Sequence, residues 1–170
     1  MTEPQVKKPL DIEAALDRYA HTIRRICFLY LKRREDVEDV FQDVFLSYLQ
    51  RQEPFQCDEH EKAWLLRTAI NRCKDLAGAF WHRQVGALDE DIMAQVPEDS
   101  HEILEAVNQL PPQERTAIYL FYYEGYSAQE IAGMTSSKTN TIYSHLHRAR
   151  KRLHKKLGGF EHEEDDPESF

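Results

Sequence analysis

Hydrophobic residues in the first half of the chain recur every three or four positions, which is the period of an amphipathic helix. Along residues 11–33 the apolar positions are Ile12, Leu16, Tyr19, Ile23, Ile26 and Tyr30. Along residues 35–51 they are Val37, Val40, Phe41, Val44, Phe45, Tyr48 and Leu49. A third helix, over residues 59–82, is expected to bury Trp64, Leu65, Ala69, Ile70, Cys73, Leu76 and Phe80. Three such helices can close a small bundle of their own.

The helical period is lost between residues 85 and 99. This stretch contains Gly86, Pro97 and a dense group of carboxylates. Glycine and proline interrupt regular structure, and repulsion between carboxylates keeps a chain extended. We therefore expect residues 85–99 to form an acidic linker.

A second group of helices is predicted for residues 100–158. The apolar face of its first helix comprises Ile103, Leu104 and Val107. Pro111 and Pro112 end that helix, and Pro112 suits the first turn of the next one because its missing N–H is not needed there. Gly125 is expected to end this next helix as a C-terminal cap.

The last part of this group has the layout of a helix-turn-helix. Ser127 and Glu130 have the spacing of a capping box, in which each residue bonds to the backbone of the other, for a short helix. A polar turn follows over residues 135–139, and a longer helix is predicted from about residue 139 to residue 157. Two helices joined by a short turn, with the second helix basic, are typical of DNA-binding helix-turn-helix proteins.

Together these patterns predict an all-α fold with two small helical domains. A three-helix domain is expected over residues 11–84, the acidic linker over 85–99 and the helix-turn-helix domain over 100–158. Residues 159–170 form an acidic tail that we expect to be disordered, because few apolar residues are available to bury there.

The net charge of the chain, −8 at pH 7, hides a strong segregation of charge. Residues 85–114 contain eight acids and no Lys or Arg, and residues 161–170 contain six acids and no base. Residues 138–156, in contrast, carry seven Lys or Arg and no acid. The local field decides whether a phosphate backbone is attracted, so this basic segment could bind nucleic acid.

Several classes of function have no support in the sequence. No apolar run approaches the roughly 20 residues that cross a bilayer, and the N-terminus has no secretory signal, so we expect a cytoplasmic protein without membrane insertion. The cysteines, Cys27, Cys57 and Cys73, form no C-x-x-C pair and are expected to be reduced thiols. His145 and His147 lie on different helix faces, which is poor spacing for metal ligands. No catalytic, metal or cofactor motif is present, so we expect no enzymatic activity, no metal and no cofactor.

The last helix has one apolar stripe, which comprises Ile142, Leu146, Ala149 and Leu153. A helix-turn-helix inserts the N-terminal part of its second helix into the major groove, and later basic residues lie against phosphates. The expected DNA contacts are Lys138, Thr139, Asn140, Thr141, Tyr143, Ser144, His147, Arg148, Lys151 and Arg152. A merely solvated amphipathic helix is the alternative. The capped helix before it, the turn and the absence of acids favour DNA.

The stretch from residue 110 to residue 157 resembles region 4 of the extracytoplasmic-function (ECF) sigma factors, which binds the −35 promoter element. The shared features are Leu110-Pro111, Glu114-Arg115, the aromatic run before Gly125, Glu130-Ile131-Ala132, Thr141-Ile142 and Arg148-Ala149-Arg150.

The first half of the chain resembles region 2 of the same family. In VEDVFQDVFLSYL, the resemblance implies that Asp39, Gln42 and Asp43 dock on the β′ clamp helices of RNA polymerase. HEKAWLLRTAINRCKDL resembles the segment that opens the −10 element, with Trp64, Arg67 and Asn71 at matching positions. The full set expected at the −10 element is Phe55, Trp64, Arg67, Asn71 and Lys74, with Phe80 or Trp81 lining the same region. Trp64 and Phe80 also fit the apolar stripe, so a core role is the alternative for both.

The chain departs from the family pattern in two places. Where the family has a run of arginines after the −10 segment, only His82 and Arg83 are present. In the turn of the helix-turn-helix, Thr135 and Ser137 stand at places that are usually apolar, which implies a looser turn or a cap by Ser137 on the next helix. Base preference is not carried over, because Tyr143, His145 and His147 differ from several relatives.

The sequence thus predicts a sigma factor whose partners are core RNA polymerase, promoter DNA and, by resemblance, an anti-sigma factor. One alternative is a regulator that binds DNA as a dimer through its helix-turn-helix, without core polymerase. Another is a protein-interaction module whose basic helix never meets DNA. The acidic tail is expected to compete with DNA for the basic helix.

Overall fold

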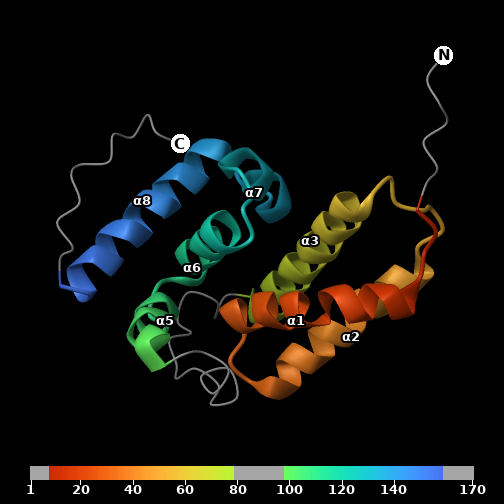
Figure 1. Cartoon of the computed structure of the whole chain (residues 1–170), viewed down its shortest axis with the longest axis horizontal. Helices are drawn as coiled ribbons and strands as arrows, with labels where there is room; N and C mark the ends of the chain where they lie inside the picture. Colours follow the sequence, from red (N-terminus) through yellow and green to blue (C-terminus); the bar gives the residue numbers. More distant parts are fainter. Residues whose placement is uncertain (1–7, 79–97, 159–170) are drawn as a thin grey trace. The chain divides into compact units, whose positions relative to one another are not determined.

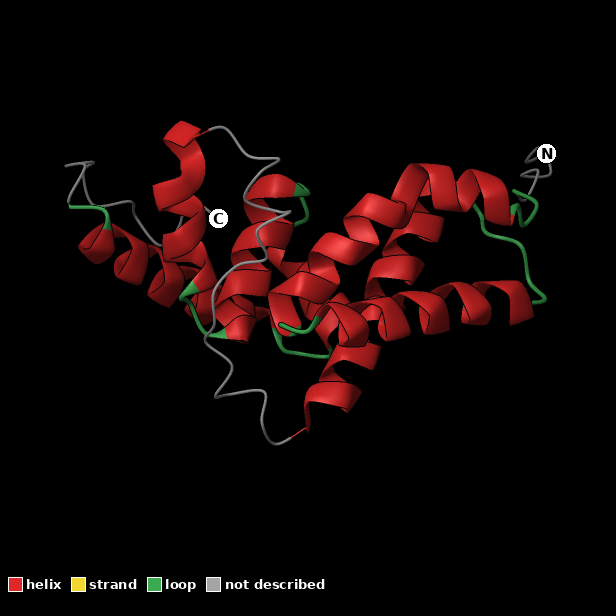
Figure 2. Cartoon of the chain, turned by 90° about the horizontal axis from the view of Figure 1, so that it is seen from below, coloured by secondary structure: helices red, strands yellow, loops and turns green. Residues whose placement is uncertain are grey.

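The computed structural model describes residues 8–78 and 98–158. Within these ranges the secondary structure is helical (Figures 1 and 2), apart from an isolated antiparallel bridge between Lys8 and Phe55. The prediction of an all-α fold is confirmed. The chain divides into two compact units, which contain residues 8–78 and residues 98–158 of the described ranges.

The first unit is a bundle of three helices, α1 (Ile12–Tyr30), α2 (Arg34–Gln50) and α3 (Asp58–Ala77). Each helix packs against the other two. The largest fully buried side chains of this unit are Ile23, Ile26, Tyr30, Tyr48, Phe55, Leu65, Leu66 and Ile70. Burial of each aliphatic side chain contributes about 1.5–3 kcal/mol, so this shared core explains why the three amphipathic helices close on one another.

Two apolar residues expected inside this bundle lie at its surface. Leu76 is 52% exposed and Leu49 is 59% exposed. The buried stripe of α3 runs instead through Ala69, Cys73 and Ala77 at helical spacing, which turns the neighbouring Leu76 toward solvent. Trp64 is only partly buried, and Phe80 lies outside the described residues.

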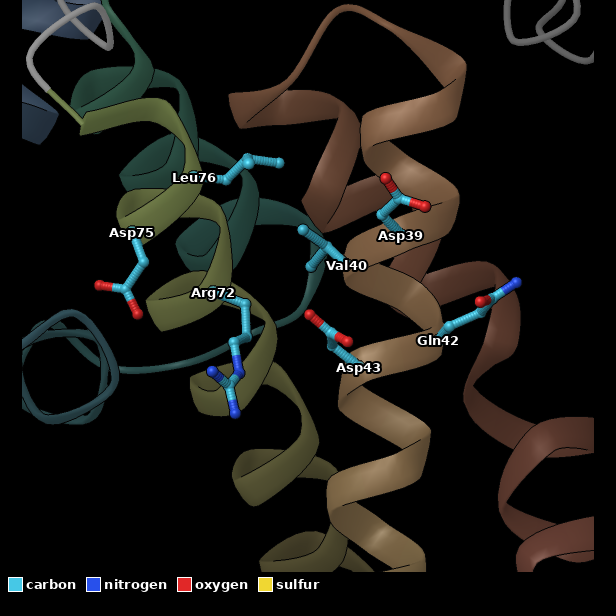
Figure 3. Close-up of a pocket in the computed structure, with 7 residues that line it drawn as sticks. All are labelled: Asp39, Val40, Gln42, Asp43, Arg72, Asp75 and Leu76. Atoms are coloured by element: carbon cyan, nitrogen blue, oxygen red, sulfur yellow. The ribbon is translucent and has the colours of Figure 1, made fainter.

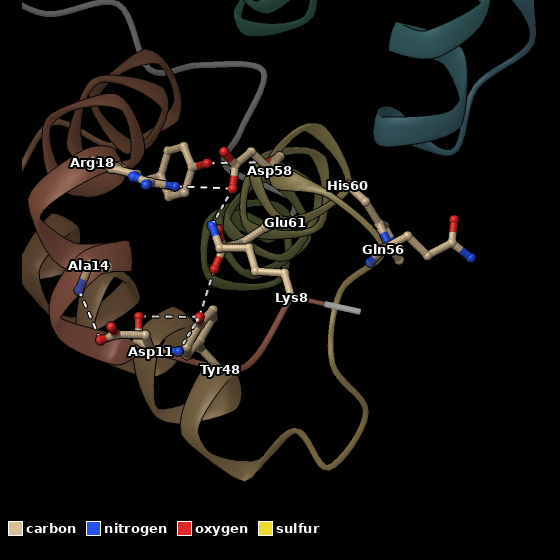
Figure 4. Close-up of polar contacts among 10 residues, drawn as sticks. Lys8, Asp11, Ala14, Arg18, Tyr48, Gln56, Asp58, His60 and Glu61 are labelled. Atoms are coloured by element: carbon tan, nitrogen blue, oxygen red, sulfur yellow. Dashed lines mark hydrogen bonds and ion pairs between the residues drawn. The ribbon is translucent and has the colours of Figure 1, made fainter. Parts of the chain in front are cut away.

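A polar network ties the segment before α1 to the bundle (Figure 4). Lys8 contacts the carboxylates of Asp58 and Glu61, and Arg18 pairs with Asp58 at 3.0 Å. Glu61 is 1% exposed, and the Tyr48 hydroxyl donates a hydrogen bond to it at 2.6 Å. Burial of a carboxylate is unfavourable unless it is paired with a cation and hydrogen-bonded. Lys8 supplies the cation, and Tyr48 supplies the hydrogen bond.

The second unit is built around the long helix α8 (Thr139–Lys156), which packs against α5 (His101–Asn108), α6 (Pro112–Ile118) and α7 (Ala128–Thr135). A 3-10 turn, Glu98–Ser100, precedes α5, and α6 continues into a π-helical turn, Tyr119–Tyr123. The core of this unit comprises Leu110, Leu120, Ile131, Ile142 and Leu146.

The predicted caps of this unit are confirmed. Helix α6 begins at Pro112, and Gly125, just after the π-helical turn, has a φ of +77°, a conformation that glycine adopts at little cost. Ser127 and Glu130 form the expected capping box. The Ser127 side chain accepts from the Glu130 N–H at 3.2 Å, and the Glu130 carboxylate accepts from the Ser127 N–H at 2.8 Å.

Of the two alternatives given for the turn, the cap by Ser137 on α8 is wrong. Lys138 is the N-cap residue, and its side chain forms no capping hydrogen bond. The Ser137 hydroxyl instead donates to the carbonyl of Thr135 at 3.4 Å, and the Ser137 N–H donates to the carbonyl of Ala132 at 2.9 Å. The turn is defined by Ser136, which is left-handed with a φ of 55°.

Several expectations fall partly or wholly outside the described residues. These are the linker over residues 85–99, of which only residues 98 and 99 are described, the residues Trp81, His82 and Arg83, and the acidic tail over residues 159–170. Across the two described ranges, no helix is long and apolar enough to cross a membrane. Cys27 and Cys73 are buried and Cys57 is exposed, and all three are free thiols.

Candidate nucleic-acid interface and docking face

Most of the expected DNA contacts on and just before α8 are exposed. The apolar stripe of the helix buries Ile142, Leu146 and Ala149, with Leu153 partly exposed. This burial leaves the polar positions accessible from the first turn onward. Exposed are Lys138, Asn140, Thr141, Ser144, His147, Arg148, Lys151 and Arg152, whereas Thr139 and Tyr143 are partly buried.

Charge on α8 increases toward its C-terminal end. The helix contains no acid, and its last turn carries His154, Lys155 and Lys156. Cations at this end are stabilised by the helix dipole, and they also create the positive potential that attracts phosphates. The uncharged donors and acceptors Asn140, Thr141 and Ser144 lie at the other end. This distribution suits a helix whose start contacts base edges and whose end contacts the phosphate backbone of DNA.

Two arginines of this helix form ion pairs that sequence analysis missed. Arg148 Nε lies 3.4 Å from Glu114 Oε1, and Arg152 Nε lies 3.2 Å from Glu114 Oε2. Glu114 belongs to the first turn of α6 and is 4% exposed. Periodicity gives no signal for a pairing between residues so far apart in the chain.

Four of the residues expected at the −10 element share one face of α3. Trp64, Arg67, Asn71 and Lys74 follow one another at spacings of three and four, which places them along one side of a helix. Arg67 and Asn71 are exposed, while Trp64 and Lys74 are partly buried. Burial lowers the pKa of Lys74 below its usual value, because desolvation disfavours the charged ammonium.

Phe55 does not join this face, and the expectation that it contacts DNA is not supported. Its side chain is 0% exposed. The ring packs 5.8 Å from the ring of Tyr48 and 5.7 Å from that of Trp64, and the Arg51 guanidinium lies over it at 4.4 Å. The backbone bridge to Lys8 holds Phe55 in this position. Phe55 therefore supports Trp64 from inside the bundle.

The expected docking residues lie on one face of α2. Asp39, Gln42 and Asp43 are all exposed and follow the i, i+3, i+4 spacing of neighbours on a helix. Figure 3 shows them on α2, which forms one wall of a groove, with Val40 directed toward α3 and Gln42 directed away from it. The groove has a volume of about 530 Å³.

The opposite wall of this groove comes from α3 and was not predicted. It comprises Arg72, Asp75 and Leu76 (Figure 3). The groove therefore combines more carboxylates than cations with the apolar surface of Leu76. Leu76 was expected in the core because it fits the apolar period of the helix. Its side chain is instead exposed, and it forms part of this wall of the groove.

Comparison with known proteins identifies the family. Residues 15–81 match the family model of Sigma-70 region 2, and residues 100–153 match that of Sigma-70, region 4. The ECF RNA polymerase sigma factor SigM of Mycobacterium tuberculosis is 30% identical over 146 residues, which cover 83% of this chain and 74% of SigM. The chain belongs to the ECF RNA polymerase sigma factors.

Further relatives extend over nearly the whole of this sigma factor. The RNA polymerase sigma factor SigV of Bacillus subtilis is 27% identical over 161 residues, which cover 89% of this chain and 93% of SigV. Among solved structures, the sigma factor RpoE of Bartonella quintana, in complex with the anti-sigma factor NepR, matches with a TM-score of 0.65 and 24% identity over 88% of this chain and 98% of that one. CnrH, in complex with the cytosolic domain of CnrY, matches with a TM-score of 0.61 and 20% identity, covering 86% of both chains.

The family and the order of its two regions, as predicted from the sequence, are confirmed. The two structural matches show that this sigma factor shares their fold. The roles assigned to single side chains on α2, α3 and α8 stay predictions.

Proposed function

We propose that this protein directs core RNA polymerase to specific promoters and initiates transcription there. The observation that carries the proposal is the presence of sigma regions 2 and 4 in order in one chain. Each region also has an exposed face of suitable chemistry, acidic on α2 and basic on α8. A regulator that binds DNA through its helix-turn-helix without core polymerase would not require region 2. The proposed role is regulatory, and the protein would carry it out in the cytoplasm without catalysing a reaction of its own.

The two units would have different roles in this process. Residues 11–84 would dock on core polymerase and open the −10 element, and residues 100–158 would bind the −35 element, with the acidic linker between them. Exposed Arg67 and Asn71 on α3 and the polar start of α8 support this division.

The docking groove would receive the β′ clamp helices. Its carboxylates, Asp39, Asp43 and Asp75, outnumber its one guanidinium, Arg72, so it favours a basic partner surface. None of these four residues forms an ion pair within the described part of the chain, which leaves their charges available. Leu76 adds apolar area that a helix could cover.

An anti-sigma factor is a further partner that we propose. RpoE and CnrH, which share this fold, were both solved with a bound protein, NepR and the cytosolic domain of CnrY respectively. A protein that covers the docking groove or the face of α8 would prevent polymerase or promoter binding.

Transcription in vitro tests the proposal. The purified chain is mixed with core polymerase and genomic DNA fragments, and transcript starts are mapped. We expect starts at defined promoters that need both proteins. No core-dependent initiation would reject the proposal. If the isolated chain binds the same DNA as tightly as the mixture does, the stand-alone regulator is favoured. If DNA binding does not weaken as salt is raised, the basic helix does not contact phosphates and the interaction module is favoured.

A further inference from the structure

Glu114 connects α6 to two successive turns of α8. Its two carboxylate oxygens pair with different arginines, Oε1 with Arg148 at 3.4 Å and Oε2 with Arg152 at 3.2 Å. The guanidinium of the neighbouring Arg115 donates to the carbonyl and side-chain oxygens of Asn108 at 2.9 and 3.0 Å. A single carboxylate thus holds two cations of the helix that we expect to enter the major groove.

The environment of this carboxylate favours the paired arrangement. Glu114 is 4% exposed, and within the described residues its Oε2 atom has no hydrogen bond beside the ion pair with Arg152. A buried carboxylate without a cation is strongly unfavourable, so the two arginines are held close to it. Arg148 is fixed at a second point, because its Nη2 atom lies 3.0 Å from Nδ1 of the buried His145.

Both arginines keep capacity for another ligand. Their side chains remain 51% and 56% exposed. A guanidinium has five N–H donors in a fixed plane, which is more than Glu114 and His145 together engage. Each arginine is therefore anchored on its inner side and accessible on its outer side.

We propose that Glu114 is a positioning residue for promoter recognition, which orients Arg148 and Arg152 before DNA arrives. The inference rests on the proposed function. An arginine that is already ordered loses less conformational entropy on binding, and its donors meet the DNA in one geometry. The negative charge of Glu114 also weakens the general attraction of this face for phosphates. Glu114 thus lowers nonspecific affinity and raises discrimination between sequences.

Glu114→Gln tests this inference because it keeps the size of the side chain and removes its charge. Holoenzyme assembled from the full chain and core polymerase is titrated onto a promoter fragment found by start mapping, and onto the same fragment with its −35 element scrambled. We expect the ratio of the two affinities to fall about tenfold, because phosphate contacts from misplaced arginines no longer set the register in which the first turns of α8 contact the bases. Affinity for the scrambled fragment should stay the same or rise. A ratio within twofold of the wild-type ratio would overturn the inference.

A matched control and a second background separate positioning from a general structural role. Glu102→Gln removes an equal charge from an exposed position on α5 and should leave the ratio unchanged. In a chain that already carries Arg148→Gln and Arg152→Gln, Glu114→Gln should have no further effect on the ratio. A further fall there would show that Glu114 does not act through the arginines.

Two remaining outcomes are also decisive. If Glu114→Gln does not fold, Glu114→Asp, which keeps the charge but shortens the reach, should lower the ratio partially, and an unchanged ratio would overturn the inference. If wild-type holoenzyme itself shows no preference for the intact −35 element, the proposed function fails, and this inference fails with it.

Discussion

Tyr48 and Glu61 share a hydrogen bond of 2.6 Å that joins the end of α2 to the first turn of α3. Burial, together with this bond to a carboxylate, raises the pKa of Tyr48 to about 12. The hydroxyl therefore stays protonated at physiological pH and donates to Glu61, while it accepts from the Asp11 N–H at 3.2 Å. The bond fixes the two helix ends on either side of the loop that carries Phe55.

Removal of this donor should destabilise the first unit. In Tyr48→Phe the ring contacts with Phe55 and Trp64 remain, but Glu61 loses a hydrogen bond in a buried place. Hydrogen bonds to charged groups contribute about 1.5–3 kcal/mol, so the free energy of unfolding should fall by about that amount. Urea denaturation followed by circular dichroism measures it. Tyr122→Phe, at a position 57% exposed, is the control and should change stability by less than about 0.5 kcal/mol. Equal effects of the two variants would contradict the prediction.

The contact between Lys8 and Asp58 should make stability depend on pH in the acid range. The hydrogen bond from Lys8 lowers the pKa of Asp58 below its ordinary value of 3.8. A carboxyl with a lowered pKa in the folded state stabilises the protein above its ordinary pKa, and this stabilisation is lost as pH falls through the folded pKa. Lys8→Met should therefore lower the melting temperature at neutral pH, with a difference from wild type that shrinks as the pH is lowered below about 4. Melting curves across this range measure it, and a difference that does not vary with pH would refute the prediction.

The acidic wall of the groove should contribute to polymerase binding. Asp39→Ala combined with Asp43→Ala removes two exposed charges, so the fold should persist while affinity for core polymerase falls by about tenfold or more. A binding titration with labelled chain measures the affinity. Glu13→Ala with Asp17→Ala removes the same charge from exposed positions on α1 and should have little effect. If both pairs weaken binding equally, total charge matters and the groove does not.

The wall from α3 can be tested separately. Leu76→Asp changes a residue that is already 52% exposed, so its effect on stability should be small. It should weaken binding to core polymerase, because a carboxylate replaces apolar surface in the groove. If the variant binds core polymerase as tightly as wild type does, α2 alone accounts for docking and the wall from α3 does not contribute.

The two ends of α8 should differ in what they contribute to DNA binding. Asn140→Ala, in the first turn, should reduce affinity for the preferred −35 element by about 1–3 kcal/mol and relax the sequence preference at one position. Lys155→Ala, in the last turn, should weaken binding to all sequences alike and reduce the salt slope by about one. Titrations of holoenzyme at several salt concentrations, on intact and altered promoters, distinguish the two effects. A uniform loss in Asn140→Ala would reject a base contact.

Local signals in the sequence were sufficient for much of this fold. Pro112 and the pair Ser127–Glu130 define helix starts through backbone groups close by, and the structure has each as predicted. Residues whose surroundings come from distant parts of the chain were harder to predict. Phe55 sits in a loop without a period, and its burial depends on a bridge to Lys8.

The groove and the cluster at Glu114 show the same limit. Leu76 satisfies the apolar period of α3, yet the packing of α2 leaves it at the surface. Glu114 stands in a motif shared with the family, but only the packing of α6 on α8 brings it to Arg148 and Arg152. Periodicity finds which face of a helix is apolar. It does not find which charged side chains meet across two helices.

The anchoring of Lys8 has a practical consequence for anyone who wants to isolate the first unit. A fragment trimmed to the start of α1 would leave the carboxylate of Glu61 without its cation and the loop backbone at Phe55 without its bridging N–H. Recombinant fragments for spectroscopy or crystallisation should therefore begin upstream of Lys8, and affinity tags at that end need a spacer that leaves the anchor undisturbed.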